Sequence, residues 1–388
     1  MLDRVLERRL ADGKKSVLLL GPRQVGKTTL CRALKPDVTI DLADEAEYLR
    51  YAKDPGRLRQ ESAAWPVRTL VLIDEIQRVP ALLNLVQLIV DRPRNQTRFL
   101  LTGSSARKLR RRGVNLLPGR VVLEYLDPLL MSELGANFVL EKCLRLGMLP
   151  ELQLMDTEAN ETLETYSEIY LREEIRAEAL TQNVGAYARF LDVVAEMSGQ
   201  WLNYSKLSAD TEIPKETIRR YVSILEDTLL LFRLPAFQPS IKTTRRVLQR
   251  ERVLLFDVGV RNALLGLHRR AASQQELGPL FEQWLILQVF YLDRAFRKRW
   301  KLSSYRTEGG AEVDLVIETA DELLGVEIKA SKNIRAADTR GLASLADLVA
   351  KAKPLRKIIA CWVDRPLKID DVSVVNYREF LTELEQLE

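Results

Sequence analysis

The feature that most constrains the fold is a glycine-containing loop that follows an apolar run near the N-terminus. The run is "SVLLLG" (16–21), and the loop "GPRQVGKT" (21–28) matches the pattern G-x-x-x-x-G-K-[ST]. A run that is apolar at every position predicts a strand buried on both faces, and therefore a parallel sheet. Glycines let backbone N–H groups converge on a phosphate, and the N-terminus of the following helix adds a favourable partial charge. The loop therefore predicts a nucleotide site.

Individual roles follow from the chemistry of the loop side chains. Lys27 is expected to reach the β- and γ-phosphates of ATP, and the Thr28 hydroxyl is expected to bind Mg²⁺. The full set of predicted nucleotide-binding residues is Gly21, Pro22, Arg23, Gln24, Val25, Gly26, Lys27, Thr28 and Thr29.

A second apolar run, "TLVLIDEIQ" (69–77), ends in two carboxylates. Parallel sheets bind their ligands at the carboxyl ends of the strands, so Asp74 is expected to hold the Mg²⁺ ion through water. Glu75 is then placed to orient and deprotonate the attacking water, because phosphoryl transfer depends mainly on positioning. The alternative is that the two acids only cap a strand.

Three further runs complete the N-terminal pattern: "VTIDL" (38–42), "RFLLTGS" (98–104) and "RVVLEYL" (120–126). Their alternation with helix-like segments predicts an α/β fold with a parallel sheet. Thr102 and Ser104 end one of these runs, where a polar side chain can sense the γ-phosphate by a hydrogen bond. They are also residues that commonly form turns, so a purely structural role stays open.

The segment 201–237 predicts a helix, a turn, a second helix and a short hairpin, which together resemble a winged helix. Pro214 stands at a favoured first-turn position, and Ile218, Tyr221 and Val222 form an apolar face at helical spacing. Such a unit faces DNA or serves only as a packing or oligomerisation module with a solvated basic face. The candidate nucleic-acid-binding residues are Lys215, Thr217, Arg219, Arg220, Arg245 and Arg246.

The stretch "EVDLVIETADELLGVEIKAS" (312–331) predicts a β-hairpin with its loop at 319–322. In that register Asp314 faces Glu327, and like charges opposite one another are unfavourable without a cation. Lys329 lies on the same face as Glu327, because strand side chains repeat every two residues. The plain alternative for this lysine is a cross-strand ion pair with Glu312.

Upstream of the hairpin, Glu282 lies on the apolar face of a predicted helix (277–292), an awkward place for an unpaired acid. Together with the hairpin it matches, in order, the helix-acid, strand-Asp, E-x-K pattern of the restriction-endonuclease-like (PD-(D/E)XK) fold. The resemblance implies a second Mg²⁺ or Mn²⁺ bound by Glu282, Asp314 and Glu327, with Lys329 activating water. Whether this centre cuts DNA stays open.

Charge and composition limit the classes of partner and the cellular location that can be expected. The net charge is +5, with basic clusters at 106–113, 242–252 and 293–301, which favour a polyanionic partner over a merely solvated surface. Neither an apolar run of about 18 residues nor the apolar region of a secretory signal is present, so a cytoplasmic protein without a membrane segment is expected. The single histidine, His268, argues against chemistry that needs several imidazoles.

The order of the motifs resembles the AAA-type branch of P-loop ATPases, in which a neighbouring subunit usually supplies an arginine. That resemblance implies Arg120 for this role, with Arg111 and Arg112 as competitors. Arg172 and Arg176 are possible second sensors in the lid.

The whole chain resembles a large prokaryotic family of predicted AAA-type ATPases with a C-terminal domain of unknown function. The matching pieces are "LLLGPRQVGKTTL", "VLIDEIQRVP", "FLLTGSSARKL", "LLPGRVVLEYLDPLLMSEL", "VLLFDVGVRNALLG", "FEQWLILQVF", "EVDLVIE" and "VEIKAS". One departure is "LGMLPE" (146–151), where the family usually has a Gly-Gly-aromatic-Pro turn. The implied domains are a P-loop ATPase core (1–127), a helical lid (128–195), a winged-helix unit (196–240) and a restriction-endonuclease-like α/β domain (241–388).

The function implied is a magnesium-dependent ATPase that acts on duplex or branched DNA as a homo-oligomer, for example a hexameric ring. The alternative is a nucleotide-controlled regulatory switch whose nuclease-like domain is a non-cleaving interaction module. DNA-stimulated ATP hydrolysis distinguishes the two.

Overall fold

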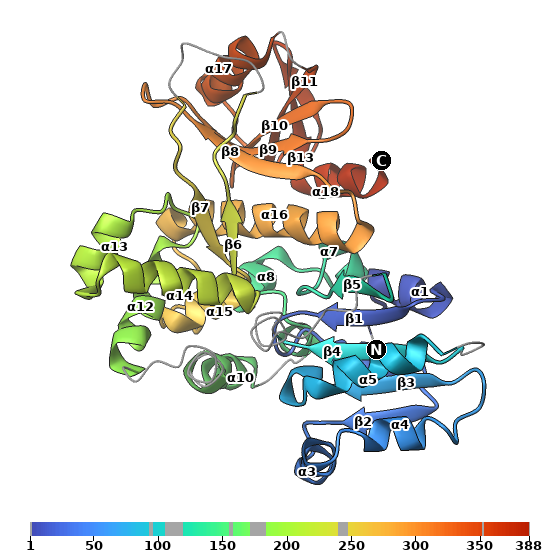
Figure 1. Ribbon diagram of the computed structural model, residues 1–388. Helices are drawn as coiled ribbons and strands as arrows, with labels where there is room; N and C mark the ends of the chain where they lie inside the picture. Colours follow the sequence, from blue (N-terminus) through green and yellow to red (C-terminus); the bar gives the residue numbers. More distant parts are fainter. Residues whose placement is uncertain are drawn as a thin grey trace. The chain divides into compact units, whose positions relative to one another are not determined.

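The computed structural model describes residues 2–92, 96–104, 119–154, 158–170, 184–239, 247–350 and 353–387. The chain forms two compact units. Figure 1 shows their helices and strands, coloured along the sequence. Unit 1 comprises Met1–Leu129 together with Asp227–Leu230, and unit 2 comprises Leu130–Glu226 together with Leu231–Glu388. The predicted boundaries near 195 and 240 fall inside unit 2 and stay predictions.

Unit 1 is built on a five-stranded sheet in the order β2-β3-β4-β1-β5, with all neighbouring strands parallel. This confirms the parallel sheet that the apolar runs predict. β1, β3 and β4 are buried nearly throughout, whereas the edge strands β2 and β5 are only partly buried, because each has a neighbour on one side. The strands are β1 (Ser16–Leu20), β2 (Val38–Asp41), β3 (Leu70–Asp74), β4 (Arg98–Gly103) and β5 (Val121–Tyr125).

Helices pack against this sheet and complete the core of unit 1. Leu82, Leu83 and Val86 of one helix are fully buried against strand residues such as Val71 and Phe99. The helices of the unit are α1 (Val5–Asp12), α2 (Lys27–Ala33), α3 (Glu45–Lys53), α4 (Arg57–Glu61) and α5 (Ala81–Val90), with a 3-10 turn η1 (Ile76–Arg78).

The first part of unit 2 is mainly helical. The predicted helix-turn-helix segment forms two helices, and the second buries Ile218, Tyr221 and Val222 as its spacing predicts. The predicted hairpin after it differs, because β6 pairs antiparallel with a strand about twenty residues further on. The elements are α7 (Met131–Leu134), η2 (Gly135–Asn137), α8 (Leu140–Leu146), α9 (Pro150–Leu154), α10 (Ala159–Thr165), η3 (Tyr166–Tyr170), α12 (Val184–Met197), α13 (Tyr204–Thr211), α14 (Lys215–Asp227), β6 (Leu231–Leu234), β7 (Arg252–Leu255) and α15 (Val258–Leu264).

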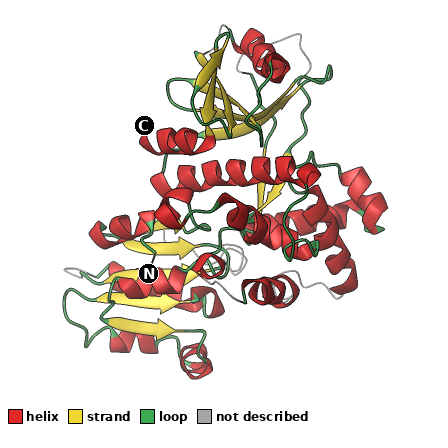
Figure 2. Cartoon of the chain, turned by 180° about the vertical axis from the view of Figure 1, so that it is seen from behind, coloured by secondary structure: helices red, strands yellow, loops and turns green. Residues whose placement is uncertain are grey.

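The C-terminal part of unit 2 carries a six-stranded mixed sheet in the order β12-β13-β11-β10-β9-β8. Figure 2 shows its strands as the yellow arrows near the top of the view. β8, β9 and β10 are antiparallel to one another, and β10, β11 and β13 are parallel. The elements are α16 (Gln274–Phe296), β8 (Lys301–Arg306), β9 (Glu312–Glu318), β10 (Leu323–Ile328), η4 (Ala336–Thr339), α17 (Arg340–Val349), β11 (Leu355–Cys361), β12 (Leu367–Ile369), β13 (Val372–Asn376) and α18 (Tyr377–Gln386). Of the helices in the described ranges, none combines the length and the apolar character needed to cross a bilayer.

The unusual turn "LGMLPE" is explained by a buried carboxylate at the start of α15. Asp257 accepts hydrogen bonds from the backbone N–H groups of Met148 (2.6 Å), Gly259 (2.8 Å) and Val260 (3.0 Å). Gly147 has φ +79°, and a Cβ there would lie 1.8 Å from Asp257 Oδ1. The glycine at 147 is therefore required by the close approach of the carboxylate, even though the turn lacks the second glycine of the family pattern.

Asp257 should make stability depend on pH. Burial raises the pKa of Asp257 to about 6, against the opposing effect of its three N–H donors. The folded chain therefore holds more protons than the unfolded chain between the ordinary value of 3.8 and about 6, so this group's contribution falls as the pH rises through that window. The full effect is about 3 kcal/mol.

The measurement is the urea midpoint of unfolding between pH 4 and 7. In Asp257→Asn the decline across that window should be smaller than in the wild type, whereas the exposed Asp210→Asn should leave it unchanged. Equal slopes in all three proteins would contradict the assignment.

Candidate nucleotide site and C-terminal carboxylate cluster

The predicted phosphate loop connects β1 to α2 and has the backbone that such a loop requires. Gly26 (φ +91°) and Gln24 (φ +61°) adopt left-handed conformations. A Cβ at Gly21 would lie 2.1 Å from the carbonyl oxygen of Leu126, so only glycine fits beside the end of β5. The Lys27 ammonium is buried and donates to the carbonyl oxygens of Gly21 (2.8 Å) and Pro22 (2.7 Å).

The structure brings Thr28, Asp74 and Thr102 together at the carboxyl edge of the sheet. The Thr28 hydroxyl donates to Asp74 Oδ2 at 2.7 Å, and the Thr102 hydroxyl donates to Asp74 Oδ1. Thr102 also accepts the backbone N–H of Glu75 at 3.0 Å. One chain of hydrogen bonds therefore runs from the phosphate loop through β3 to β4.

These residues fit a magnesium nucleotide. A hydroxyl and a carboxylate at 2.7 Å form an all-oxygen donor set of the kind Mg²⁺ prefers, and a buried ammonium lies in the same loop. When bound, the ion neutralises charge that develops on phosphate oxygens.

Sequence reasoning missed Gln77. Its side chain is buried, and its Nε2 donates to the Glu75 carboxylate and to the Ser104 hydroxyl. The only signal in the sequence is its place two residues after Glu75 in "IDEIQ".

Arg120 lies at the edge of the sheet opposite its own phosphate loop. It directly precedes β5, which runs parallel to β1, whereas the loop follows the far end of β1. Its guanidinium donates to both carboxylate oxygens of Asp91 at 2.7 and 2.8 Å, and this hydrogen bonding raises the pKa of Arg120. An arginine-finger role in a neighbouring copy stays a prediction. The competing Arg111 and Arg112, and the lid residues Arg172 and Arg176, lie outside the described residues.

The register of the C-terminal hairpin is as predicted. Glu318 pairs with Leu323, and the ladder continues to Leu315 opposite Val326, so Asp314 and Glu327 are the next residues along. The Asp314 carboxylate accepts the backbone N–H of Ile328 at 2.8 Å.

The ion pair considered between Lys329 and Glu312 does not form. Lys329 Nζ instead donates to Glu327 Oε1 at 2.6 Å, a residue only two positions earlier in the chain. Glu312 lies 3.6 Å from the Arg306 guanidinium and accepts the indole N–H of Trp201 at 3.2 Å. Because Glu327 and Lys329 lie on the same face two residues apart, Lys329 reaches Glu327 more directly than it reaches Glu312 on the neighbouring strand.

Glu282 is not an unpaired acid, because Arg252 forms an ion pair with it. Arg252 is only 4% exposed, so assigning it to a surface basic cluster (242–252) is wrong. Its guanidinium also donates to the carbonyl oxygens of Gly199 (2.9 and 2.5 Å) and Asp314 (3.4 Å). Sequence reasoning missed this partner because its role depends on burial.

The cations Arg252 and Lys329 compensate the buried acids of the cluster only in part. Burial, followed by the charge of Glu282, raises the pKa of Asp314. Burial and the charge of Asp314 raise the pKa of Glu327. Burial opposes the charge of Arg252, but Glu282 and Asp314 outweigh it and raise the pKa of Arg252.

A metal ion bound by Glu282, Asp314 and Glu327 stays a prediction. Across the described part of the chain, no three His, Cys, Asp or Glu side chains are grouped as a metal ion would need. Glu282 forms an ion pair with Arg252 and Glu327 forms one with Lys329, whereas Glu327 Oε2 is buried without a hydrogen-bond partner among the described residues.

The predicted DNA-facing helix α14 exposes Lys215, Arg219 and Arg220, and Thr217 is half-buried. Arg219 donates to Glu216 at 2.7 Å, which reduces the local positive charge. Arg245 and Arg246 lie outside the described residues.

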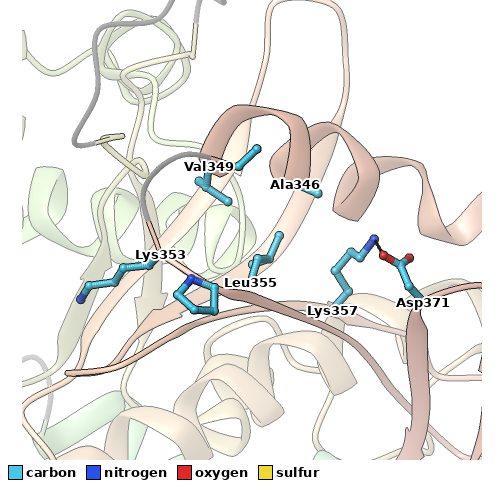
Figure 3. Close-up of a pocket in the computed structure, with 8 residues that line it drawn as sticks. Ala346, Val349, Lys353, Leu355, Lys357 and Asp371 are labelled. Atoms are coloured by element: carbon cyan, nitrogen blue, oxygen red, sulfur yellow. Dashed lines mark ion pairs between the residues drawn. The ribbon is translucent and has the colours of Figure 1, made fainter.

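A cleft of ≈ 540 Å³ lies beside α17 and the start of β11 (Figure 3). Its two described lysines are engaged: Lys357 with Asp371 across the cleft, and Lys353 with Glu318 at 3.1 Å. The cleft therefore presents no unpaired cationic group among its lining residues.

Comparison with known families agrees with the nucleotide site. Residues 13–135 match the model of an AAA domain, residues 138–271 a domain of unknown function (DUF8612), and residues 277–380 a domain of unknown function (DUF4143). These matches support an AAA-type ATPase that carries a C-terminal domain of unknown function.

Two mycobacterial proteins are similar over most of the chain. They are the uncharacterized proteins Mb2031c of Mycobacterium bovis and Rv2008c of Mycobacterium tuberculosis. Each is 29% identical over 319 residues, covering 81% of this chain and 70% of the relative.

Solved structures give weaker likenesses. Caenorhabditis elegans PCH-2 has 17% identity and a TM-score of 0.21, covering 44% of this chain and 46% of its own. AMPPCP-bound DnaA from Aquifex aeolicus has 14% identity and a TM-score of 0.24, covering 57% of this chain and 84% of its own. TM-scores this low support no statement about the present chain.

Proposed function

We propose that the protein is a magnesium-dependent ATPase that acts on DNA as a homo-oligomer. The hydrogen-bonded chain Thr28–Asp74–Thr102–Glu75 is the observation that carries the catalytic part of this proposal. The exposed cationic side chains of α14 support the DNA part, because they lie on a helix whose other face is buried.

At the nucleotide site each residue has one task. Lys27 would exchange its carbonyl partners for phosphate oxygens, and Thr28 and Asp74 would hold the magnesium ion. Glu75 accepts a proton from the attacking water at its carboxylate, while Thr102 fixes the backbone that carries it.

An oligomer completes this site. Arg120 lies at the opposite edge of the sheet from its own loop, and this position supports a role at the site of another copy. A ring, hexameric in the simplest case, would place each Arg120 at a neighbour's nucleotide.

DNA should stimulate ATP turnover, and the stimulation should weaken with salt because phosphate contacts release counterions. The double variant Lys215→Ala/Arg220→Ala should lose most of the stimulation while keeping the DNA-free rate. The matched control is Arg365→Ala/Lys368→Ala, which removes the same charge from exposed positions elsewhere. The assay is steady-state ATPase with linear, forked and four-way-junction DNA.

If no DNA changed turnover at low salt, the proposal would be abandoned for the second candidate, a nucleotide-controlled switch with a non-cleaving C-terminal module. The ion pair between Arg252 and Glu282 favours this candidate, because it gives Glu282 a cationic partner within the chain. Manganese-supported nicking of DNA that Asp314→Ala or Glu327→Ala abolished would instead favour a cutting centre.

A further inference from the structure

Gln77 joins the ends of two neighbouring strands of the ATPase sheet. It lies in the 3-10 turn that follows β3 and is 6% exposed. Its Nε2 donates to a carboxylate oxygen of Glu75 and, at 3.2 Å, to the hydroxyl of Ser104 beyond β4. One amide group therefore links the proposed proton acceptor to the polar tip of β4.

The backbone around Gln77 is arranged to admit this amide. A Cβ at Gly103 would lie 2.9 Å from Gln77 Oε1, so glycine leaves room for the side chain. Glu75 itself has φ +56°, a conformation that costs a non-glycine residue about 1–3 kcal/mol. Its N–H bond to Thr102 and its carboxylate bond to Gln77 hold it there.

Packing alone does not explain a glutamine at this position. Gln77 Oε1 is buried and has no hydrogen-bond partner among the described protein atoms, which costs about 1–3 kcal/mol. Methionine would fill a similar volume without that cost. The benefit of the amide therefore lies in its N–H donors, and these hold Glu75 and Ser104.

We propose that Gln77 is a positioning residue that aims the Glu75 carboxylate, and that Ser104 in turn holds Gln77. The proposal rests on the proposed role of Glu75 as proton acceptor. The two hydroxyls near the end of β4 then act on hydrolysis through Glu75: Thr102 holds its backbone N–H, and Ser104 holds the amide that binds its side chain.

Steady-state ATPase kinetics of Gln77→Met test this assignment. We expect kcat to fall on the order of 10²-fold, as expected for a misplaced catalytic group, while KM and the binding of a fluorescent non-hydrolysable ATP analogue stay unchanged. Ser104→Ala should reduce kcat less than Gln77→Met does. Ser104→Thr keeps the hydroxyl and should therefore have a kcat near that of the wild type. The exposed Gln60→Met is the matched control.

A double-mutant cycle separates positioning from a general structural effect. If Gln77 acts through Glu75, then Gln77→Met should cause no further loss in a Glu75→Gln background. An unchanged kcat in Gln77→Met, or a full additional loss in that background, would overturn the proposal. Should Gln77→Met fail to fold, Ser104→Ala in both backgrounds replaces it.

Failure of the proposed ATPase function would give a different result from failure of the Gln77 proposal alone. If Glu75→Gln kept wild-type turnover, or the wild type hydrolysed no ATP, both the role of Glu75 and that of Gln77 would be overturned together.

Discussion

Lys27→Ala should lose ATP turnover completely. The Lys27 ammonium is buried in the phosphate loop and held by two backbone carbonyl oxygens, at 2.8 Å from Gly21 and 2.7 Å from Pro22. Charge-assisted hydrogen bonds are each worth about 1.5–3 kcal/mol, so losing even one phosphate contact weakens nucleotide binding by about 10–100-fold. Turnover falls further, because the same ammonium stabilises charge that develops in the transition state.

The measurement combines nucleotide titration with steady-state ATPase rates. Lys27→Met keeps most of the buried aliphatic volume and separates loss of charge from loss of packing. Lys53→Ala, an exposed lysine of α3, is the control that should behave as wild type. Undiminished turnover in Lys27→Ala and Lys27→Met would refute the site.

Arg252→Met should destabilise unit 2 by about 3–5 kcal/mol, because removing one partner of a buried ion pair leaves the other uncompensated. The side chains of Arg252 and Glu282 are 5% and 22% exposed. The variant also loses the donors to the Gly199 and Asp314 carbonyl oxygens. Thermal and urea unfolding measure the effect, and Arg252→Met/Glu282→Leu should recover part of the loss, since the Glu282 charge is then no longer left without its partner.

The unfolding temperature of Arg252→Met in the presence of Mn²⁺ is a second measurement. If Arg252 takes the place of a metal ion, Mn²⁺ should raise the unfolding temperature of Arg252→Met and leave that of the wild type unchanged. Arg252→Met/Asp314→Ala should lose the shift, which assigns it to the carboxylate cluster. A wild-type shift that Asp314→Ala abolished would show that the cluster binds metal with Arg252 in place.

Local patterns predicted the geometry of the candidate nucleotide site. The loop at Gly21–Thr28 is contiguous, so the positions of its glycines and its lysine depend on residues close together in the chain. Asp74 and Thr102 end parallel strands, and parallel strands end at one edge, so their meeting at Thr28 followed from topology alone. The hairpin register followed from the length of a four-residue loop in the same way.

Partners of buried charges were not predictable in this way. Arg252 is one of several arginines in a basic stretch, and nothing in its neighbours marks it as the buried one. Gln77 was missed for a related reason, since its contact with Ser104 crosses from β3 to β4.

By itself, the sequence determined the parallel sheet, the phosphate loop and the two carboxylates that follow β3, because each depends on residues close together in the chain. The tertiary structure alone decided that Arg252 pairs with Glu282 and that Gln77 holds Glu75. The physical reason is burial: a side chain removed from water must find its charge or hydrogen-bond partner among whatever groups the fold places beside it.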